Sequence, residues 1–379
     1  MSNAARGMYR AGCDRGTDLR RGNGRLTKSS PTARSLQFLQ SSTCPTVACY
    51  PLLAIDRAMS EAGLVARLNH QTTTQSFLAK VVSKLRLVRN LRRSSAGPVF
   101  VAFMGFTESK TLPFSCWTEI LPYCFDCWPA TYDRWTSFFA RHRVRLAFFS
   151  ARQSAGYFRQ KLPAMRSVWL AEATEPFEYD PSIPLGQREI DVLELGRKND
   201  VFHNRVAAFL ASRKKVHHFE RTKGQIIFPN RQELIRGLAQ TKISVCFPCS
   251  QTHPERSGAV ETVTHRYFES MASKCLILGH APAELIDLFG YNPVIEVEEG
   301  AEFEQIDFVL NNFGAFHALI QRNYRRLLEV GTWTQRVPVV LNAVQELFRS
   351  REAVTEQPTV ADSDSPIHQF QRRSPQWQR

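Results

Sequence analysis

The sequence lacks the features that mark several common protein classes. No apolar run reaches the ~18 residues that a membrane-spanning helix needs. The arginine-containing N-terminus has no apolar segment of the kind found in secretory signals. A P-loop, a G-x-S-x-G elbow and a G-x-G-x-x-G turn are also missing. These absences argue against a membrane-spanning or exported protein, and against the sites that the three motifs build.

Acidic residues are scarce in the two segments that carry most of the net charge. The formal net charge is +14. Residues 1–35 contribute +6 (eight Lys or Arg, two Asp), and residues 80–93 contribute another +6 (six Lys or Arg, no acid). A domain that reads duplex nucleic acid usually spreads its cations over one folded face. We therefore predict that nucleic acid is an unlikely partner.

The rest of the composition is that of a folded protein. With 379 residues, 43% apolar and 11% aromatic, the chain has enough material for two domains with tails. Its nine cysteines lie in apolar strings such as residues 123–127, which favours reduced thiols. We predict a cytoplasmic location, with attachment to the inner face of a membrane as an open alternative.

Composition also divides the chain. Polar, low-complexity sequence predicts a disordered leader over residues 1–43 and a disordered tail over 351–379. Residues 172–184, with three prolines and several acids, predict a linker. The linker separates an N-terminal domain (44–183) from a C-terminal domain (184–350).

Short apolar runs alternate with helical patterns through both predicted domains, which is typical of parallel sheets covered by helices on both faces. We predict strands at 99–103, 120–125, 144–149, 168–170, 190–195, 226–228, 243–247, 275–278 and 294–297. We predict helices at 131–142, 203–213, 231–240, 264–273, 303–313, 315–329 and 333–349.

Segment 75–93 combines apolar residues at helical spacing with a cationic opposite face. One interpretation is a helix that lies on an anionic membrane surface. The other is an ordinary helix packed on the sheet of the first domain. The sequence leaves both open.

Two glutamates stand eight residues apart in the stretch ETVTHRYFE, at Glu261 and Glu269. Such a pair also arises by chance, but Thr262 and Thr264 are good N-cap residues. A helix that begins there places Glu261 in a loop at the carboxyl end of strand 243–247, where open α/β sheets bind ligands. The helix start suits a phosphate, and Glu269 suits the two hydroxyls of a ribose.

A basic turn follows another predicted strand. Gly196 permits a tight turn, and Arg197 and Lys198 then stand at the carboxyl end of strand 190–195, placed for a pyrophosphate. A solvated basic turn is the alternative interpretation.

These stretches resemble retaining glycosyltransferases of the GT-B type that carry an E-x7-E motif, a family 4-like class with a bacterial spore-coat-type subgroup. The resemblance rests on Glu261–Glu269 with the small residues and strand that follow, on Leu195-Gly-Arg197, and on the loop that starts at Gly279. It is strong over 186–300 and weaker over 98–185. It implies an α/β protein of GT-B architecture, with two Rossmann-like domains facing across a cleft.

The resemblance also implies roles. Glu269 would bind the ribose of a UDP- or GDP-type sugar donor, and Glu261 would contact the donor sugar. Arg197 would hold the diphosphate, helped by Gly196, by amides near Thr262 and Thr264, and by a second cation. Lys198 and Arg205 are both candidates for that cation, and Gly279 opens the next donor-site loop. Thr262-Val-Thr264 stands where the family usually has Gly-Phe-Gly.

The chemistry implied is glycosyl transfer with retention of configuration and without a metal, to a glycan, a lipid-linked group or another hydroxyl. In the N-terminal half, Asp126 stands at a strand end and is a candidate to orient the acceptor hydroxyl. A capping Asp at a turn is the alternative. An inactive scaffold that binds nucleotide sugar, and a basic membrane-surface adaptor, remain competing functions.

Three patterns with metal-site spacing carry no metal prediction. The Cys-x-x-Cys pairs at 124/127 and 246/249 are far apart and end apolar strands. Asp362-Ser-Asp364 lies in the polar tail, and His217-His218 are expected at a surface strand edge. We therefore predict no metal site.

Overall fold

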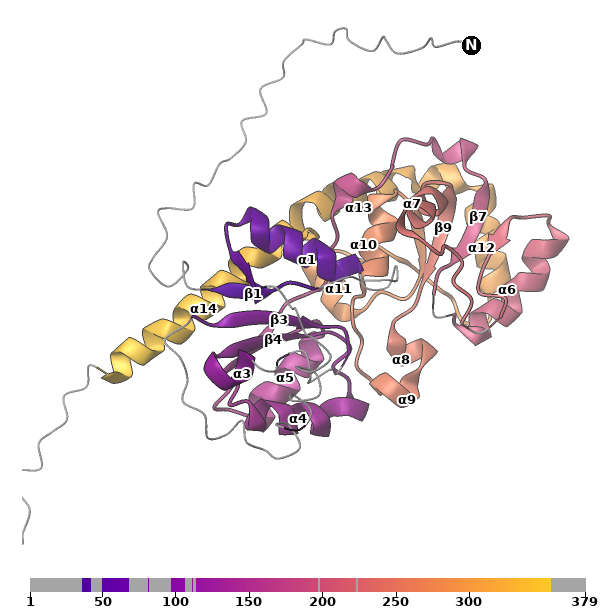
Figure 1. Ribbon diagram of the computed structural model, residues 1–379. Coiled ribbons are helices and arrows are strands. Elements are labelled where there is room, and N and C mark those ends of the chain that lie inside the picture. Colours follow the sequence, from indigo (N-terminus) through magenta and orange to yellow (C-terminus); the bar gives the residue numbers. More distant parts are fainter. Residues whose placement is uncertain are drawn as a thin grey trace, which may run out of the picture.

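The computed structural model describes residues 36–41, 50–67, 81, 97–105, 111, 114–196, 198–222 and 224–355. They form two parallel sheets, each covered by helices (Figure 1). The first sheet has six strands in the order β2-β1-β3-β4-β5-β6, and the second has five in the order β11-β10-β9-β7-β8. This is the predicted α/β architecture with two Rossmann-like halves.

The first sheet is built from short strands, and its neighbouring strands β3, β4 and β5 are almost entirely buried. Its strands are β1 (Gln37–Leu39), β2 (Val65–Arg67), β3 (Val99–Phe103), β4 (Ile120–Cys124), β5 (Leu146–Phe149) and β6 (Arg166–Trp169). Alternate residues face opposite sides. Phe100 and Phe148 enter one apolar cluster with α1 (Tyr50–Glu61), and Phe103 and Phe149 enter another with α4 (Tyr132–Arg141) and α5 (Arg152–Lys161). A short helix α3 (Phe114–Trp117) and the turn η5 (Pro129–Thr131) complete this half.

The second sheet is covered in the same way. Its strands are β7 (Ile190–Glu194), β8 (His217–His218), β9 (Thr241–Cys246), β10 (Leu276–Gly279) and β11 (Ile295–Glu296). One face packs on α7 (Arg231–Ala239), α10 (His265–Ala272), α11 (Ala283–Phe289) and α13 (His317–Val330). The other face packs on α6 (Asp200–Ser212) and α12 (Glu302–Asn311). Two short helices, α8 (Cys249–Thr252) and α9 (Pro254–Ser257), follow β9.

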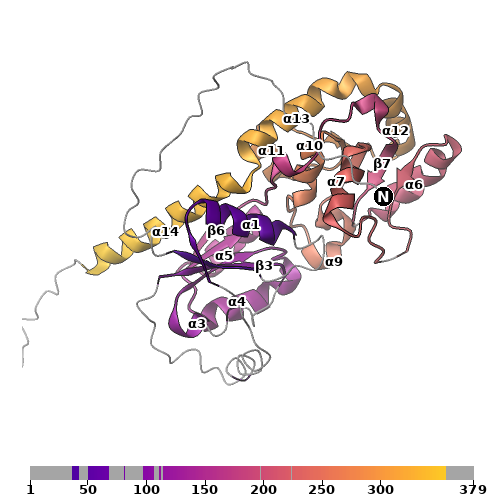
Figure 2. The same cartoon turned by 45° about the horizontal axis from the view of Figure 1, so that its top comes forward.

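The last helix returns to the first sheet. Helix α14 (Trp333–Thr355) runs from the second half along the first (Figures 1 and 2). Its Trp333, Val337 and Val340 are buried in the same cluster as Ile55 and Tyr123 of the first half. The helix therefore packs in an apolar core of the first half, although it follows the last helix of the second half in the chain. None of the helices in the described ranges is long and apolar enough to cross a bilayer.

Several sequence predictions need correction. Residues 37–39, assigned to a disordered leader, form the strand β1, which pairs with both β2 and β3. Residues 226–228, predicted as a strand, form none: Ile226 is 58% exposed, and the segment runs into Pro229, which has no N–H for a ladder. Helix α14 continues to Thr355, into the predicted tail. Segment 75–93 lies outside the described residues, apart from the helical Val81.

A buried carboxylate joins the two halves beside the carboxyl ends of their strands. Glu284 of α11 is 4% exposed. It accepts hydrogen bonds from the amide of Arg152, at the start of α5 (2.8 Å), and from the amide of Val263, just before α10 (2.7 Å). Trp128 of the first half also donates to the Thr262 hydroxyl (3.2 Å). Burial raises the pKa of Glu284 from 4.5 to about 7, against the opposing effect of the two amides.

Glycine is required where β9 and β10 end together. Gly279 pairs with Cys246 and has φ +150°. A Cβ at position 279 would lie 2.7 Å from the carbonyl carbon of Cys246. Only the absence of a side chain allows the two strand ends to approach in this way.

We predict that Gly279→Ala destabilises the protein by at least about 2 kcal/mol, because it adds both backbone strain and a steric clash. The measurement is the urea-unfolding midpoint followed by circular dichroism. Gly156→Ala is the control, since Gly156 lies in α5 with open space around its Cβ position. That change should be neutral or slightly stabilising. Equal effects of the two substitutions would contradict the packing argument.

We also predict that Glu284 makes the free energy of unfolding depend on pH. Its pKa is higher in the folded chain than in the unfolded chain, so folding is favoured most when the group is protonated. The free energy of unfolding should therefore fall as the pH rises from about 4.5 to about 7, by on the order of 3 kcal/mol from this group. In Glu284→Gln this contribution disappears. The difference in free energy of unfolding between the variant and wild type should therefore change over that pH range. Asp287→Asn, which removes an exposed carboxylate from the same helix, is the control. A constant difference between Glu284→Gln and wild type over pH 4–8 would refute the assignment.

Candidate functional site

One large cavity lies where the carboxyl ends of the two sheets face each other. Its volume is about 810 Å³. Phe125 and Asp126, which follow β4, line it from the first half. Gly196 follows β7, Phe247 follows β9, and Thr264 precedes α10 on the second half. This is the place where open parallel sheets bind ligands.

The start of α10 is held by carboxylates from outside the helix. Thr264 is its N-cap residue in extended conformation, but its hydroxyl makes no capping hydrogen bond. Instead, Glu172 from the linker accepts from the His265 amide (2.8 Å) and lies 3.2 Å from its Nδ1 atom. Glu172 is 3% exposed and lines the cavity. A protein carboxylate thus already occupies part of the anion site that the helix start was predicted to offer.

A cation lies directly over the turn after β7. Gly196 has φ +79°, and a Cβ there would lie 2.8 Å from Cζ of Arg266. Glycine at 196 therefore makes room for the guanidinium of Arg266, which projects from the first turn of α10 and lines the cavity. Lys198 lines it too, with Nζ 3.8 Å from the Asp200 carboxylate. Arg197, the predicted diphosphate ligand, lies outside the described residues.

Glu269 of α10 is fixed in place at the wall of the cavity. It is 5% exposed. Its Oε1 atom accepts from the Tyr179 hydroxyl (2.7 Å) and from Nη1 of Arg231 (3.0 Å). Its Oε2 atom lies 3.8 Å from Nε2 of His265. Arg231 in turn stacks over the ring of Tyr50 at 3.7 Å, so Glu269 is held by residues from both halves.

The two carboxylates beside His265 shift the pKa of its imidazole. Burial alone would lower the pKa of the His265 imidazole, but Glu269 and Glu172 outweigh burial and raise that pKa above its ordinary value. Positive charge on His265 is therefore favoured. This imidazole and the guanidinium of Arg266 come from adjacent residues at the start of one helix.

Glu261, predicted to contact the donor sugar, is not among the described residues that line the cavity. Its Oε1 atom lies 3.0 Å from Nε2 of His280, and its amide donates to Gln153 of α5 (2.7 Å). His280 also contacts Glu296 at 3.0 Å. Glu261 thus lies where the two halves touch.

Of the remaining predicted site residues, some line the cavity and others make contacts within the protein. Asp126 and Thr264 line the cavity from opposite halves, and Asp126 has a positive φ of 50°. Thr262 is 1% exposed and is bonded to Trp128 at the contact between the halves. Gly279 has a packing reason to be glycine, and its predicted ligand role stays a prediction. Arg205 pairs with Glu302 of α12 (2.6 Å).

Sequence reasoning missed four residues that shape the site. His265 and Arg266 stand inside the stretch 261–269, and their predicted position in the first turn of a helix that follows a strand's carboxyl end was an available signal. Glu172 and Arg231 gave none, because they reach α10 from a linker and from α7, at sequence separations of 93 and 38 residues.

Sequence comparison finds no match for this chain. No family model matches it, and no curated protein does.

Structure comparison finds clear similarity. An α-glucosyltransferase in complex with UDP and a 13-mer DNA containing an HMU base has a TM-score of 0.52 and 10% identity, over 82% of this chain and 98% of that one. The same type of enzyme with DNA containing a central A:G mismatch has a TM-score of 0.52 and 11% identity, over 82% and 99%. Anabaena HepE in complex with UDP and glucose has a TM-score of 0.51 and 10% identity, over 81% and 99%.

These structures overturn one prediction. We predicted nucleic acid as an unlikely partner from the distribution of cations along the chain. Glycosyltransferases with this architecture are nevertheless known in complex with DNA. The argument from charge is therefore wrong as a ground for excluding nucleic acid.

At 10–11% identity, the similarity establishes architecture. Both sheets are matched, because more than four fifths of this chain and nearly the whole of each similar chain are covered. The chain has the GT-B fold of glycosyltransferases.

Proposed function

We propose that the protein transfers a glycosyl group from a nucleoside-diphosphate sugar, of the UDP or GDP type, to a hydroxyl acceptor, with retention of anomeric configuration. The observation that carries this proposal is the cation over the turn after β7. Arg266 covers Gly196 at the start of α10, inside a cavity shared by two parallel sheets. A cation at a helix start and a strand end is a favourable site for a diphosphate.

The cavity offers places for each part of such a donor. We assign the nucleobase to the apolar wall on the second half, which consists of Leu195, Ile226, Ile227, Phe228 and Leu234. Glu269 lies on the same half and is rigidly held. We assign it to the ribose hydroxyls. The diphosphate then lies at Arg266 and the start of α10, with Lys198 beside it.

Glu172 is the residue that the diphosphate would have to replace. Its carboxylate binds the amide and imidazole of His265, which are the groups that a phosphate oxygen would use. A phosphate oxygen supplies the same acceptor with more negative charge. We propose that donor binding moves Glu172 off the His265 amide.

The transfer step breaks the bond between the anomeric carbon and the diphosphate oxygen, and the acceptor oxygen bonds to that carbon on the same face. Negative charge grows on the leaving diphosphate as the bond breaks. Arg266, the His265 imidazole and the helix start would stabilise that charge. Asp126 lines the cavity from the first half, and we assign it to the acceptor hydroxyl, which it would orient and from which it would accept the proton.

A scaffold that binds nucleotide sugar without transferring it is the second candidate. Two observations favour it: Glu261 is paired with His280 rather than lining the cavity, and carboxylates bind the amides of Val263 and His265. Both candidates predict donor binding, and only the first predicts nucleotide release in the presence of an acceptor. Glycans, lipid-linked hydroxyls and hydroxymethylated DNA are the acceptors to compare.

We predict that one of UDP, GDP, ADP and TDP raises the thermal unfolding midpoint of the protein. At ~100 times its dissociation constant the nucleotide should add about 2.7 kcal/mol. Arg266→Ala should weaken binding by about 10- to 100-fold, because hydrogen bonds to charged groups contribute ~1.5–3 kcal/mol. Calorimetric titration measures this loss directly.

Arg213→Ala is the matched control, since Arg213 is an exposed arginine at the end of α6 and does not line the cavity. Wild-type affinity in Arg266→Ala, or no response of wild type to any nucleotide, would reject the proposed donor site. Nucleotide binding without release of nucleotide from its sugar would select the scaffold.

A further inference from the structure

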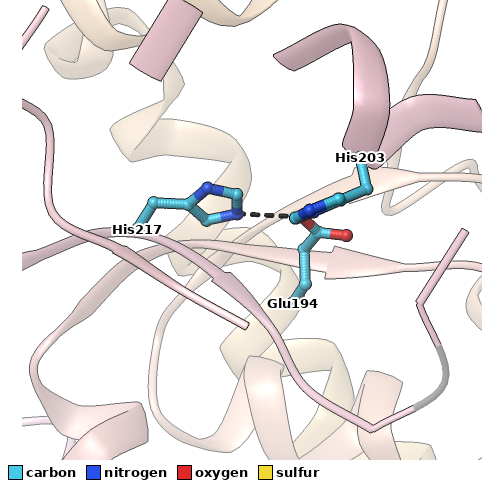
Figure 3. A group of neighbouring side chains, drawn as sticks. All are labelled: Glu194, His203 and His217. Atoms are coloured by element: carbon cyan, nitrogen blue, oxygen red, sulfur yellow. Dashed lines mark hydrogen bonds and ion pairs between the residues drawn. The ribbon is translucent and has the colours of Figure 1, made fainter. Parts of the chain in front are cut away.

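A second polar cluster lies at the end of β7, just before the turn that lines the cavity. Glu194 is the last residue of β7, His203 lies on α6, and His217 is the first residue of β8 (Figure 3). The Nδ1 atom of His203 lies 2.7 Å from Oε1 of Glu194, and Nε2 of His217 lies 2.8 Å from the same oxygen. One oxygen and two nitrogen atoms from three elements thus meet at one point.

The cluster is closed to solvent. The side chains of Glu194, His217 and His203 are 2%, 7% and 10% exposed. The ring of Phe219 covers both imidazoles, with centroids 4.5 Å from His203 and 4.7 Å from His217. We expected His217 and His218 at a surface strand edge. Strand β8 is indeed an edge strand, but the side chain of His217 faces inward.

The carboxylate of Glu194 is incompletely satisfied. Its Oε2 atom is buried and has no hydrogen-bond partner within the part of the chain that the structure describes. Its Oε1 atom contacts only the two imidazoles, and no described lysine or arginine pairs with it. A buried carboxylate oxygen without a partner is costly, and a bound cation would supply that partner.

We propose that Glu194, His203 and His217 bind one divalent ion of the zinc class. Two imidazole nitrogens and a carboxylate oxygen are a known three-residue zinc ligand set, and these donors suit borderline divalent metals better than magnesium or calcium. All three ligand atoms lie within 4.8 Å of one another. Bonds to zinc of ~2.0–2.2 Å require only small outward shifts. Each ring then presents a lone pair in place of an N–H, and Oε2 of Glu194 is the atom left for a fourth position.

The place of the cluster indicates a structural role for the ion. Strand β8 has two residues, and among the strands of the described ranges it pairs with β7 alone. Residues of α6 and β8 therefore meet the end of β7 through this cluster. Gly196 and Lys198, which line the cavity, come two and four residues after Glu194. The ion would anchor the base of that turn, without taking part in the transfer step, and the inference does not rest on the proposed function.

The test is a titration of the complete, chelator-treated protein with zinc chloride, followed by calorimetry and thermal unfolding. One equivalent should bind and raise the unfolding midpoint. His203→Ala and His217→Ala should each lower the affinity more than about tenfold, since even residues that only support a ligand commonly have effects of ~10–100-fold. His218→Ala is the matched control, because His218 is the neighbour of His217 on β8 and is not part of the cluster.

Cobalt spectra of the wild-type protein provide a readout that does not depend on whether the variants fold. Cobalt in the proposed site should show the visible bands of low-coordinate nitrogen and oxygen ligation, without a thiolate charge-transfer band. Thiolate bands would place the metal on the cysteines and overturn the proposal. Absence of zinc binding at micromolar concentration, or unchanged binding in a folded double variant of His203 and His217, would also overturn it.

Discussion

The amide hydrogen bonds of two buried glutamates determine how the two halves of this protein meet. Glu284 accepts from the amides of Arg152 and Val263, and Glu172 accepts from the amide of His265. Each carboxylate satisfies backbone donors at a helix start or just before one, where an intrahelical partner is missing. The carboxyl ends of both sheets are thereby drawn together, and the cavity lies beside this contact. Helix α14 reinforces the arrangement with apolar contacts to the first half.

The site itself depends on two complementary features: position 196 has no side chain, and a cation fills the space. Gly196 leaves the space that the guanidinium of Arg266 fills. The same helix turn carries His265, whose positive charge is favoured by Glu172 and Glu269. Charges of both signs are therefore concentrated at the start of α10 before any ligand arrives. A dianionic diphosphate can exchange with Glu172 at this point because the amide and imidazole donors are already oriented toward an anion.

Much of the fold was readable from the sequence. Eight of the nine predicted strands correspond to strands of the two sheets, because runs of buried Val, Ile, Leu and Phe are long enough to be recognised. β1 escaped because three residues beside a polar stretch carry little signal. The Ile226–Phe228 run misled because its apolar side chains line a cavity instead of a sheet. In the site, the motif at 261–269 indicated Glu269 and Thr264, and the turn after a predicted strand indicated Gly196; all three line the cavity, and their ligand roles stay predictions. It could not find Glu172 or Arg231, whose contacts with α10 arise only from tertiary packing.

The most direct measurement is a crystal structure of the protein with UDP bound. Our account predicts the β-phosphate against the guanidinium of Arg266 and the amide of His265, with the carboxylate of Glu172 moved away from that amide. The ribose hydroxyls should lie at Glu269. UDP bound elsewhere, or bound with Glu172 still on the His265 amide and no phosphate contact to Arg266, would contradict the central claim that the start of α10 is the diphosphate site.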